Sequence, residues 1–452
     1  MAGDSTLVSA LVPAQSLRDR QSIKLAFPPP LGLYIHMPWC EKKCPYCDFN
    51  SHAFKDLGAR HTAGLSLMKA EVDRQQTVDE QMSAQRMNGD MQHDRLYQTY
   101  VDALIRDIEC SLASVWGRTV QTVFIGGGTP SLCPPREMAR LLDALRSLLR
   151  LAADAEITME ANPGSVERAR FEAFADAGIH RLSLGVQSFS DAQLNRIGRV
   201  HGRAEAIAAV DTALSIFPRV NIDLMYGQPA QTLSSLEQDL DIVLDRSGSA
   251  LGHLSLYQFT LEPNTWFAKH PPADMPDEET IEAMQNRIAL RLSQSGFEQY
   301  EVSAWSLPGQ RCRHNLNYWQ FGDYLGVGAG AHGKLSDHRG IRRTIRRREP
   351  EAYIASVLGA DTLAKPAERW LESDDLPFEF MLNALRLKDG VPSHWWQERC
   401  GLPAEMMLKY TNLAFSKGLL DPDPAVFRAS ALGWRFLNDL QALFLADAPK
   451  RC

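Results

Sequence analysis

Three cysteines lie within eight residues, in the segment LYIHMPWCEKKCPYCDF. Cys40, Cys44 and Cys47 have the spacing CxxxCxxC and directly follow an apolar run. Three thiolates on one tight loop can hold three corners of a cubane iron–sulfur cluster, which leaves the fourth iron open to a small chelating molecule. Zinc is the alternative, with His36 or His52 completing a Cys3His set, although structural zinc sites usually take paired ligands from two separate positions. The other five cysteines are scattered and are expected to be free thiols.

Further glycines and polar residues stand where other apolar runs end. A glycine run, GGGTP at 126–130, follows VFI and would let the backbone approach a ligand closely. Glu160, Gln187 and Asp223 end or interrupt three later apolar runs. A carboxylate in an apolar strand is costly unless it is paired or bound, so each could be a satisfied structural group. Their recurrence at successive strand ends favours a ligand site.

The elements that must position these residues are short β-rich runs separated by helical patterns. With one larger gap as the exception, the runs start about 25 to 40 residues from one another. This is the spacing of repeated β/α units. Segments 136–151 and 203–216 show the apolar spacing of helices. Six such units predict an α/β fold with a parallel sheet curled into a partial (β/α)6-type barrel. The predicted strands are 31–36, 120–125, 156–160, 181–185, 220–225 and 253–260.

The domain organisation follows from changes in this period. We expect an N-terminal tail over 1–27, the barrel over 28–336 and a polar insertion at about 54–96 without a chemical role. Residues 337–365 are expected to be a linker, whose run of six arginines is typical of a solvated face, with a site for acidic groups as the alternative. From 366 to 452 we expect a small helical, winged-helix-like domain with helices at 405–418 and 431–445 and a turn at 421–424.

Composition excludes several classes of protein. The chain has 452 residues, 44% hydrophobic and 23% charged, which is typical of a folded globular protein. Its net charge is −7 and its C-terminal segment is not basic, so we expect no nucleic-acid partner. No apolar run approaches the ~18 residues of a membrane helix. The N-terminus lacks a secretory signal, and Arg18, Arg20 and Lys24 leave a transit peptide as the alternative to a cytoplasmic location.

The chain resembles the radical S-adenosylmethionine (SAM) superfamily. In that family CxxxCxxC holds a [4Fe-4S] cluster whose open iron is chelated by SAM, and the resemblance runs from about residue 31 to the C-terminal domain. It implies that Cys40, Cys44 and Cys47 bind the cluster. It also implies a set of SAM contacts, of which Arg199 is expected on a following helix: Tyr34, Gly127, Gly128, Thr129, Glu160, Gln187, Arg199 and Asp223.

Within the superfamily, the chain is similar to the branch that contains oxygen-independent coproporphyrinogen III oxidases and HemW-type haem chaperones. The oxidases have a further cysteine two residues after the third cluster ligand, where this chain has Phe49. The segment HNLNYW matches the HNxxYW motif of the HemW type, which implies haem binding by His314, Asn315, Tyr318 and Trp319. His314 offers an imidazole for haem iron beside two aromatic rings, and His332 is a possible second ligand. The alternative is a histidine that satisfies backbone groups at a turn.

The resemblance therefore implies a cytoplasmic haem chaperone that binds haem, a [4Fe-4S] cluster and SAM, and that passes haem to an acceptor protein. An electron donor is a further partner that this chemistry would use. The alternative is a radical SAM enzyme of porphyrin biosynthesis, similar to the coproporphyrinogen III oxidases, in which the reduced cluster cleaves SAM. The residue at position 49 argues against that alternative.

Overall fold

The structure, a computed structural model, describes residues 23–54, 78–165, 167–248, 250–359 and 366–445, with the backbone alone for 78–90 and 165. Most of the expected tail (1–27) and part of the expected insertion (54–96) lie outside the described residues. The rest of the insertion belongs to the long helix α2 (Val78–Val115). In the described part of the chain, no helix is both long and apolar enough to cross a membrane.

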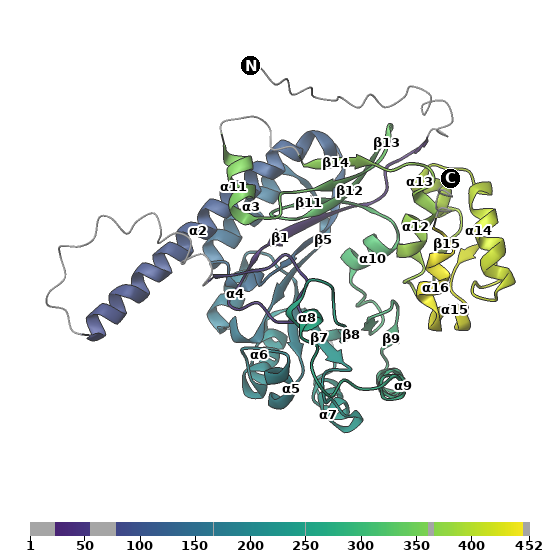
Figure 1. The fold of residues 1–452 in the computed structure, drawn as a ribbon. Coiled ribbons are helices and arrows are strands. Elements are labelled where there is room, and N and C mark those ends of the chain that lie inside the picture. Colours follow the sequence, from purple (N-terminus) through teal and green to yellow (C-terminus); the bar gives the residue numbers. More distant parts are fainter. Residues whose placement is uncertain (1–22, 55–77, 166, 249, 360–365, 446–452) are drawn as a thin grey trace, which may run out of the picture.

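A twelve-stranded sheet runs through the molecule (Figure 1). Its middle consists of six parallel strands that lie side by side in chain order and match the six predicted runs. They are β1 (Leu31–Met37), β4 (Thr119–Gly127), β5 (Arg150–Ala161), β6 (Arg181–Gln187), β7 (Arg219–Tyr226) and β8 (Leu251–Gln258). On the side away from β4, β1 pairs with β11 (Asp323–Val327) and not with β8, so the barrel stays open. The expected partial (β/α)6-type barrel is confirmed.

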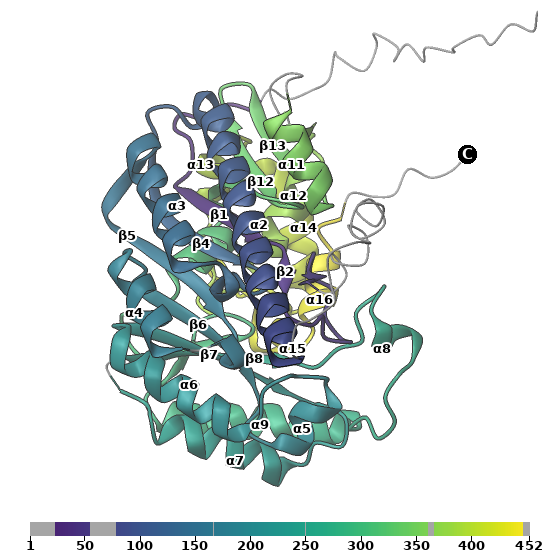
Figure 2. The same ribbon diagram turned by 90° about the vertical axis from the view of Figure 1, so that its left-hand side faces the viewer.

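Helices cover the outer face of this sheet (Figure 2). The expected helices at 136–151 and 203–216 are confirmed as α3 (Pro135–Leu148) and α6 (Arg203–Ile216). The others on this face are α2, α4 (Arg168–Asp176), α5 (Asp191–Arg196), α7 (Leu233–Leu244) and α9 (Glu278–Gln294).

The two faces of the parallel strands differ in chemistry because successive side chains point to opposite sides. In β1, Leu33 and Ile35 belong to the main apolar core, whereas Tyr34 and His36 line a cavity on the inner face. In β5, Ile157 and Met159 alternate in the same way with polar neighbours. The inner face is therefore polar along several strands, and it carries the site.

Antiparallel strands extend the sheet at both edges. One edge adds β12 (His332–Asp337), β13 (Gly340–Ile345) and β14 (Ala367–Trp370), and the other adds β10 (Ala304–Ser306) and β9 (Glu298–Gln299). Helix α8 (Trp266–Lys269) lies in the connection that follows β8.

The segment expected to be a linker, 337–365, differs from that prediction. It contains β13 and helix α11 (Pro350–Leu358), and two of its arginines are buried. Arg346 lies 2.7 Å from the Asp107 carboxylate on α2, and Arg342 lies 3.7 Å from Glu368 on β14. Arg342 belongs to β13 and Arg346 follows that strand directly, and acidic partners from other elements neutralise both. A run of basic residues read alone cannot reveal those partners.

The C-terminal helices surround a second apolar core, which includes Phe380, Trp396 and Leu440. A two-stranded ribbon of β15 (Val391–Pro392) and β16 (Val426–Phe427) accompanies them. The predicted single helix at 431–445 is wrong, because the chain leaves helical geometry at Phe436 (φ −112°, ψ 47°) and divides it in two. The helices are α12 (Leu376–Ala384), α13 (Trp395–Cys400), α14 (Glu405–Ser416), α15 (Ala431–Arg435) and α16 (Leu437–Ala442).

Candidate functional site

The cysteine loop leaves the carboxyl end of β1 and is held at both ends by backbone hydrogen bonds. Strands β2 (Trp39–Cys40) and β3 (His52–Ala53) pair across its base. The thiol of Cys40 accepts a hydrogen bond from the Thr129 hydroxyl at 3.5 Å, and the Cys47 thiol lies 3.7 Å from the Ser51 hydroxyl. The Cys44 thiol accepts from the Arg199 guanidinium at 3.7 Å. Each cysteine is thus steadied by a neighbouring polar group.

Burial favours the protonated form of two of the cysteine thiols in the absence of a ligand. Burial raises the pKa of Cys40 to about 11, and it also raises the pKa of Cys47. Because metals bind the thiolate form, occupation of this site must release protons.

The glycine run after β4 brings backbone directly against the cysteine loop. The amide of Gly128 donates to the Met37 carbonyl, and that of Thr129 donates to the Trp39 carbonyl, both at 2.7 Å. A side chain at Gly128 would collide with the Trp39 backbone at 2.5 Å. Gly127 has φ +118°, and a Cβ there would lie 2.5 Å from the His36 ring. Glycine is therefore required at both positions.

Two carboxylates lie on the inner face of the sheet. Glu160 is near the end of β5, and Asp223 is within β7. Glu160 accepts the Gly127 amide at 3.0 Å, and burial, opposed by that hydrogen bond, raises its pKa to about 7. Asp223 accepts from Asn221 at 2.7 Å and from Ser183 at 3.2 Å, and burial raises its pKa as well. No described cation forms an ion pair with either carboxylate, so both favour a cationic ligand.

Arg199 connects the cysteine loop to the ends of β5 and β6. It was expected on a helix, but it lies in the turn between α5 and α6, directly after Gly198, whose φ is +74°. Its guanidinium donates to the Gly185 carbonyl at 2.6 Å and to the Asn162 side chain at 2.7 Å, in addition to Cys44. Its Nε is buried without a hydrogen-bond partner among the described residues.

Most of the residues expected to bind a cluster and SAM line one cavity of about 140 Å³: Cys40, Cys44, Cys47, Gly127, Gly128, Glu160, Gln187, Arg199 and Asp223. Two members of the expected set lie elsewhere. Thr129 is buried behind Cys40, and Tyr34 lines a neighbouring cavity. Gln187 adopts φ 71°, a strained conformation for a non-glycine residue that often marks a ligand site. We refer to this space as the cysteine pocket.

The residues of the cysteine pocket fit an iron–sulfur cluster better than a zinc ion. The three thiols are free, yet in the described part of the chain no three His, Cys, Asp or Glu side chains converge closely enough to hold one metal ion. A cubane needs no such convergence, because each thiolate binds a different iron. The two carboxylates, which form no ion pair with a described residue, and the unpartnered Arg199 Nε fit a small ligand that carries both charges, as SAM does.

A second and larger cavity, of about 710 Å³, adjoins the cysteine pocket and shares Gly127, Glu160 and Phe49 with it. We call it the aromatic cavity. Its walls come from β1, β11, β12, β13, α10 (Arg313–Trp319) and, through Leu382 and Asn383, from α12. Its other main lining side chains are aromatic or basic: Tyr34, His36, Tyr318, Trp319, Phe321, Tyr324, His332, Lys334, Arg343, Arg346 and Arg348.

Helix α10 carries the HNxxYW segment and presents only part of it to the aromatic cavity. Tyr318 and Trp319 line the cavity, but Asn315 does not. His314 is 1% exposed, and its two ring nitrogens are engaged, Nδ1 with the Thr122 hydroxyl at 2.8 Å and Nε2 with the Tyr318 hydroxyl at 2.9 Å. Burial lowers the pKa of His314 to about 3. The structure thus differs from the expectation of an imidazole open to a ligand.

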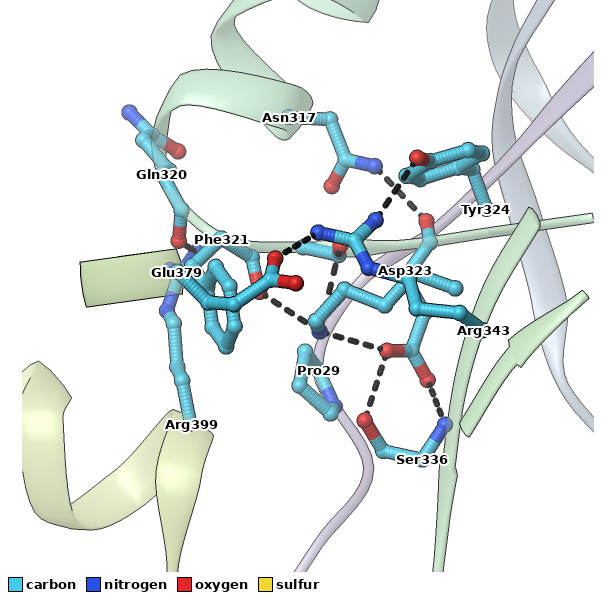
Figure 3. A network of polar contacts seen from close by, with 12 residues as sticks. Pro29, Asn317, Gln320, Phe321, Asp323, Tyr324, Ser336, Arg343, Glu379 and Arg399 are labelled. Carbon is cyan, nitrogen blue, oxygen red and sulfur yellow. Dashed lines mark hydrogen bonds and ion pairs between the residues drawn. The ribbon is translucent and has the colours of Figure 1, made fainter. Parts of the chain in front are cut away.

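Along one wall of the aromatic cavity, a polar network joins the turn after α10 to the C-terminal helices (Figure 3). The buried Lys334 ammonium donates to the Asp323 carboxylate at 3.0 Å and to the Phe321 carbonyl at 3.1 Å. Arg343 pairs with Glu379 on α12, and Arg399 on α13 donates to the Gln320 carbonyl. The C-terminal helices therefore help to hold the cavity wall.

Several of these residues were not expected from the sequence. Asn162 bridges Thr129 and Arg199, and its position two residues after Glu160 on the same side of the chain could have signalled it. Lys334 lies just before the supposed linker. Arg343 and Arg348 lie within it, where a site for acidic groups was the alternative expectation, but their local pattern does not indicate that they would line a cavity together with β1.

Comparisons with a family model, with curated proteins and with solved structures all match this chain to radical SAM proteins. A model of the radical SAM superfamily matches residues 34–243. The chain is 41% identical over 421 residues to the heme chaperone HemW of Escherichia coli (strain K12), which covers 93% of this chain and 99% of that protein. It is 37% identical over 425 residues to HemW of Haemophilus influenzae, with 93% and 99% covered. Among solved structures, E. coli coproporphyrinogen III oxidase (HemN) has a TM-score of 0.70 at 22% identity and covers 92% of this chain and 90% of its own. At that identity the likeness concerns the fold alone.

Proposed function

This chain belongs to the radical SAM superfamily and, within it, to the family of HemW haem chaperones, and we propose from that premise that it binds haem and passes it to acceptor proteins. The observation that carries the proposal is the aromatic cavity beside the cysteine pocket. A volume of about 710 Å³ lies in the range of pockets that enclose cofactor-sized ligands. Aromatic walls suit a flat macrocycle, and basic side chains suit its two propionates.

We assign the cofactors to the cysteine pocket. Cys40, Cys44 and Cys47 would hold a [4Fe-4S] cluster, which when bound supplies an open iron for SAM. SAM would lie against the glycine run, where Gly127 and Gly128 allow close approach of the backbone. Glu160 and Asp223 would face its cationic groups, while Arg199 and Gln187 would fix its orientation. Thr129 would act through Cys40, and Tyr34 would stand at the boundary with the aromatic cavity.

The haem site would take its wall from the HNxxYW helix. Tyr318 and Trp319 contribute aromatic surface to the cavity. His314 would position Tyr318 through the hydrogen bond between its Nε2 and the tyrosine hydroxyl. Asn315, which does not line the cavity, would act through the helix itself.

A second candidate is a radical SAM enzyme of porphyrin biosynthesis. It is favoured by the shared wall of the two cavities, because Gly127 and Glu160 border both and a reactive group formed in one would lie beside a ligand in the other. Phe49, which is 60% exposed at the rim of both cavities, stands in place of the oxidases' additional cysteine and argues against this activity.

An anaerobic assay with two readouts separates the candidates. The reconstituted protein is first incubated with coproporphyrinogen III, SAM and a reductant, and protoporphyrinogen IX and 5′-deoxyadenosine are quantified. The haem-loaded protein is then mixed with an apo-haem protein, and the acceptor's absorption is followed against an equal amount of free haem. Haem transfer without protoporphyrinogen IX is the expected result. Robust formation of protoporphyrinogen IX would replace the chaperone with the oxidase.

We further propose a cytoplasmic location, supported by seven free cysteines in the described part of the chain, which suit a reducing compartment. The partners that this function requires are a haem acceptor and, for any reduction of the cluster, an electron donor.

A further inference from the structure

The histidines around the aromatic cavity differ in what their ring nitrogens already bind. His36 and His332 both line the cavity. His36 is 5% exposed and is engaged on both sides, Nδ1 with the Tyr34 hydroxyl and Nε2 with the Asn50 carbonyl, each at 2.9 Å. The His332 ring forms no hydrogen bond or ion pair with any described residue. Of the described histidines at this cavity, His332 is the one whose imidazole is available to a ligand.

The fold presents His332 to the cavity by a tight turn. The residue begins β12, directly after the glycine-rich segment that follows β11. Gly328 and Gly330 have φ of +102° and +75°, and a side chain at Gly326 would overlap the His332 carbonyl at 1.9 Å. Glycines therefore let the chain reverse closely enough to bring His332 beside the end of β11.

Strand register places the neighbours of His332 on the same face of the sheet. His332 lies opposite Ile345 of β13, and Lys334, two residues on, lies opposite Arg343 of β13 and Tyr324 of β11. Because side chains alternate along a strand, all five face one side, and all five line the cavity. The imidazole thus stands at one end of a wall formed by aromatic and basic side chains.

The basic side chains of the cavity are unequally committed. Lys334 is held by Asp323, Arg346 by Asp107, and Arg343 by Glu379 and Tyr324. Arg348 is exposed, and its side chain makes one hydrogen bond to the described residues, from Nε to the Asn50 side-chain oxygen at 3.2 Å. Its terminal nitrogens are therefore the ones in the cavity most able to meet a carboxylate from a ligand.

We infer that His332 is the axial ligand of haem bound in the aromatic cavity, with Arg348 at a propionate and with Tyr318 and Trp319 along the macrocycle. This inference rests on the proposed function and names the residues that hold the cargo. Ligation forms a bond from a neutral imidazole nitrogen to iron and transfers no electron.

The test compares haem binding by His332→Ala with binding by the wild-type protein. The full chain is titrated with haem, and the Soret band and the low-temperature paramagnetic resonance signal are recorded. His338→Ala is the matched control, because His338 is exposed on the same β12–β13 hairpin and does not line the cavity. Melting curves and the absorption of the cluster check that each variant is folded.

We expect His332→Ala to lose the histidine-ligated spectrum and to bind haem roughly tenfold or more weakly, while His338→Ala behaves as wild type. Added imidazole should restore the spectrum in His332→Ala, since the free base can occupy the vacated position. His332→Met should retain binding with a changed spectrum, because a thioether is also a haem ligand. Arg348→Ala should weaken haem binding and leave the binding of haem dimethyl ester unaltered.

Two results would overturn the inference. If wild type binds haem and folded His332→Ala binds it with the same affinity and spectrum, the axial ligand lies elsewhere and the proposed function stands. If wild type binds no haem, the inference and the proposed function both fail.

Discussion

Glu156 and Glu160 lie four residues apart on β5 and point to the same side of the sheet, but of the two only Glu156 forms an ion pair with a described residue. Arg219 lies 2.6 Å from Glu156, whose carboxylate also accepts the backbone amides of Arg313 and His314. Glu160 accepts a single backbone amide and has a raised pKa. The same strand therefore carries Glu156, whose carboxylate has a structural role, and Glu160 near its carboxyl end, whose carboxylate is available to a cationic ligand.

The histidines of the inner face show the same division. His253 on β8 is engaged by the Asn221 side chain at 2.6 Å and by the Tyr300 hydroxyl at 2.7 Å, and burial lowers its pKa well below the usual value. His314 is likewise engaged on both nitrogens. His332, at the cavity, has no such partners among the described residues. Polar groups that are fully satisfied hold the sheet together, and those left unsatisfied mark where a ligand belongs.

The largest effect should follow substitution of the cluster cysteines. Cys40→Ala, Cys44→Ala or Cys47→Ala should each abolish the cluster, because each removes one of three ligands, whereas wild type should hold about four irons per chain. Iron analysis and absorption after anaerobic reconstitution measure this. Cys110→Ala is the control, since Cys110 lies on α2 away from the cysteine pocket. An equal requirement for Cys110 or Cys312 would contradict a cluster with an open iron.

Glu156→Ala should strongly destabilise the fold. It leaves two backbone amides and one guanidinium nitrogen of Arg219 without their acceptor, and breaking a buried ion pair typically costs about 3–5 kcal/mol. Chemical unfolding should show that loss. Glu172→Ala, an exposed position on α4 with a surface ion pair, should change the free energy of unfolding by less than ~1 kcal/mol. If Glu156→Ala were as mild as the control, the structural role of this carboxylate would be refuted.

Glu160→Gln, unlike Glu156→Ala, should raise the free energy of unfolding of the protein without ligands. The folded-state pKa is about 7 against an ordinary value of 4.5, so wild type loses stability as the pH rises through this window. At ~1.4 kcal/mol for each pKa unit, the loss is on the order of 3 kcal/mol at pH 8, and the amide avoids it. Unfolding at pH 4 and pH 8 measures the difference, which should vanish at pH 4.

The same substitution should weaken SAM binding. Ionised Glu160 attracts a cation, so the SAM affinity of wild type should rise between pH 6 and pH 8, while that of Glu160→Gln stays flat across the window. Equilibrium binding of SAM to the reconstituted protein at both pH values reports this. A wild-type affinity that is independent of pH would remove Glu160 from the SAM site.

The smallest effect is expected at His314. His314→Gln keeps a polar side chain but cannot satisfy both Thr122 and Tyr318, so it should lose about one hydrogen bond, or ~1 kcal/mol of unfolding free energy. Haem ligation should persist, because His314 is not the proposed ligand. Loss of the histidine-ligated haem spectrum in a folded His314→Gln protein would restore the direct role that the HNxxYW segment suggested.

The sequence predicted the fold where the pattern is local. Six parallel strands were recognised because each is a short apolar run at a regular spacing, and Glu160, Gln187 and Asp223 were found because they end or interrupt such runs. The strand β13 was missed, because its arginines, Arg342 and Arg343, are neutralised by Glu368 and Glu379, which lie beyond the supposed linker. The kink at Phe436 depends on tertiary packing that helical periodicity does not report.

Of the two parts of the candidate site, only the cysteine pocket could be predicted from the sequence. Its residues belong to short local motifs, whereas the aromatic cavity forms where β1, β12, β13 and α12 meet. The state of His314 depends on Thr122, which is 192 residues away in the chain. Whether a polar side chain is satisfied is a property of such distant partners, so the sequence could nominate both His314 and His332 but could not rank them.

The central claim, that this chain carries haem, is tested most directly by an anaerobic haem titration of the reconstituted protein. The account predicts saturation at about one haem per chain with a histidine-ligated Soret spectrum, and the same saturation in a Cys40→Ala variant that lacks the cluster, because the aromatic cavity is a separate space. Absorbance that rises without saturation, with the spectrum of free haem, would contradict it.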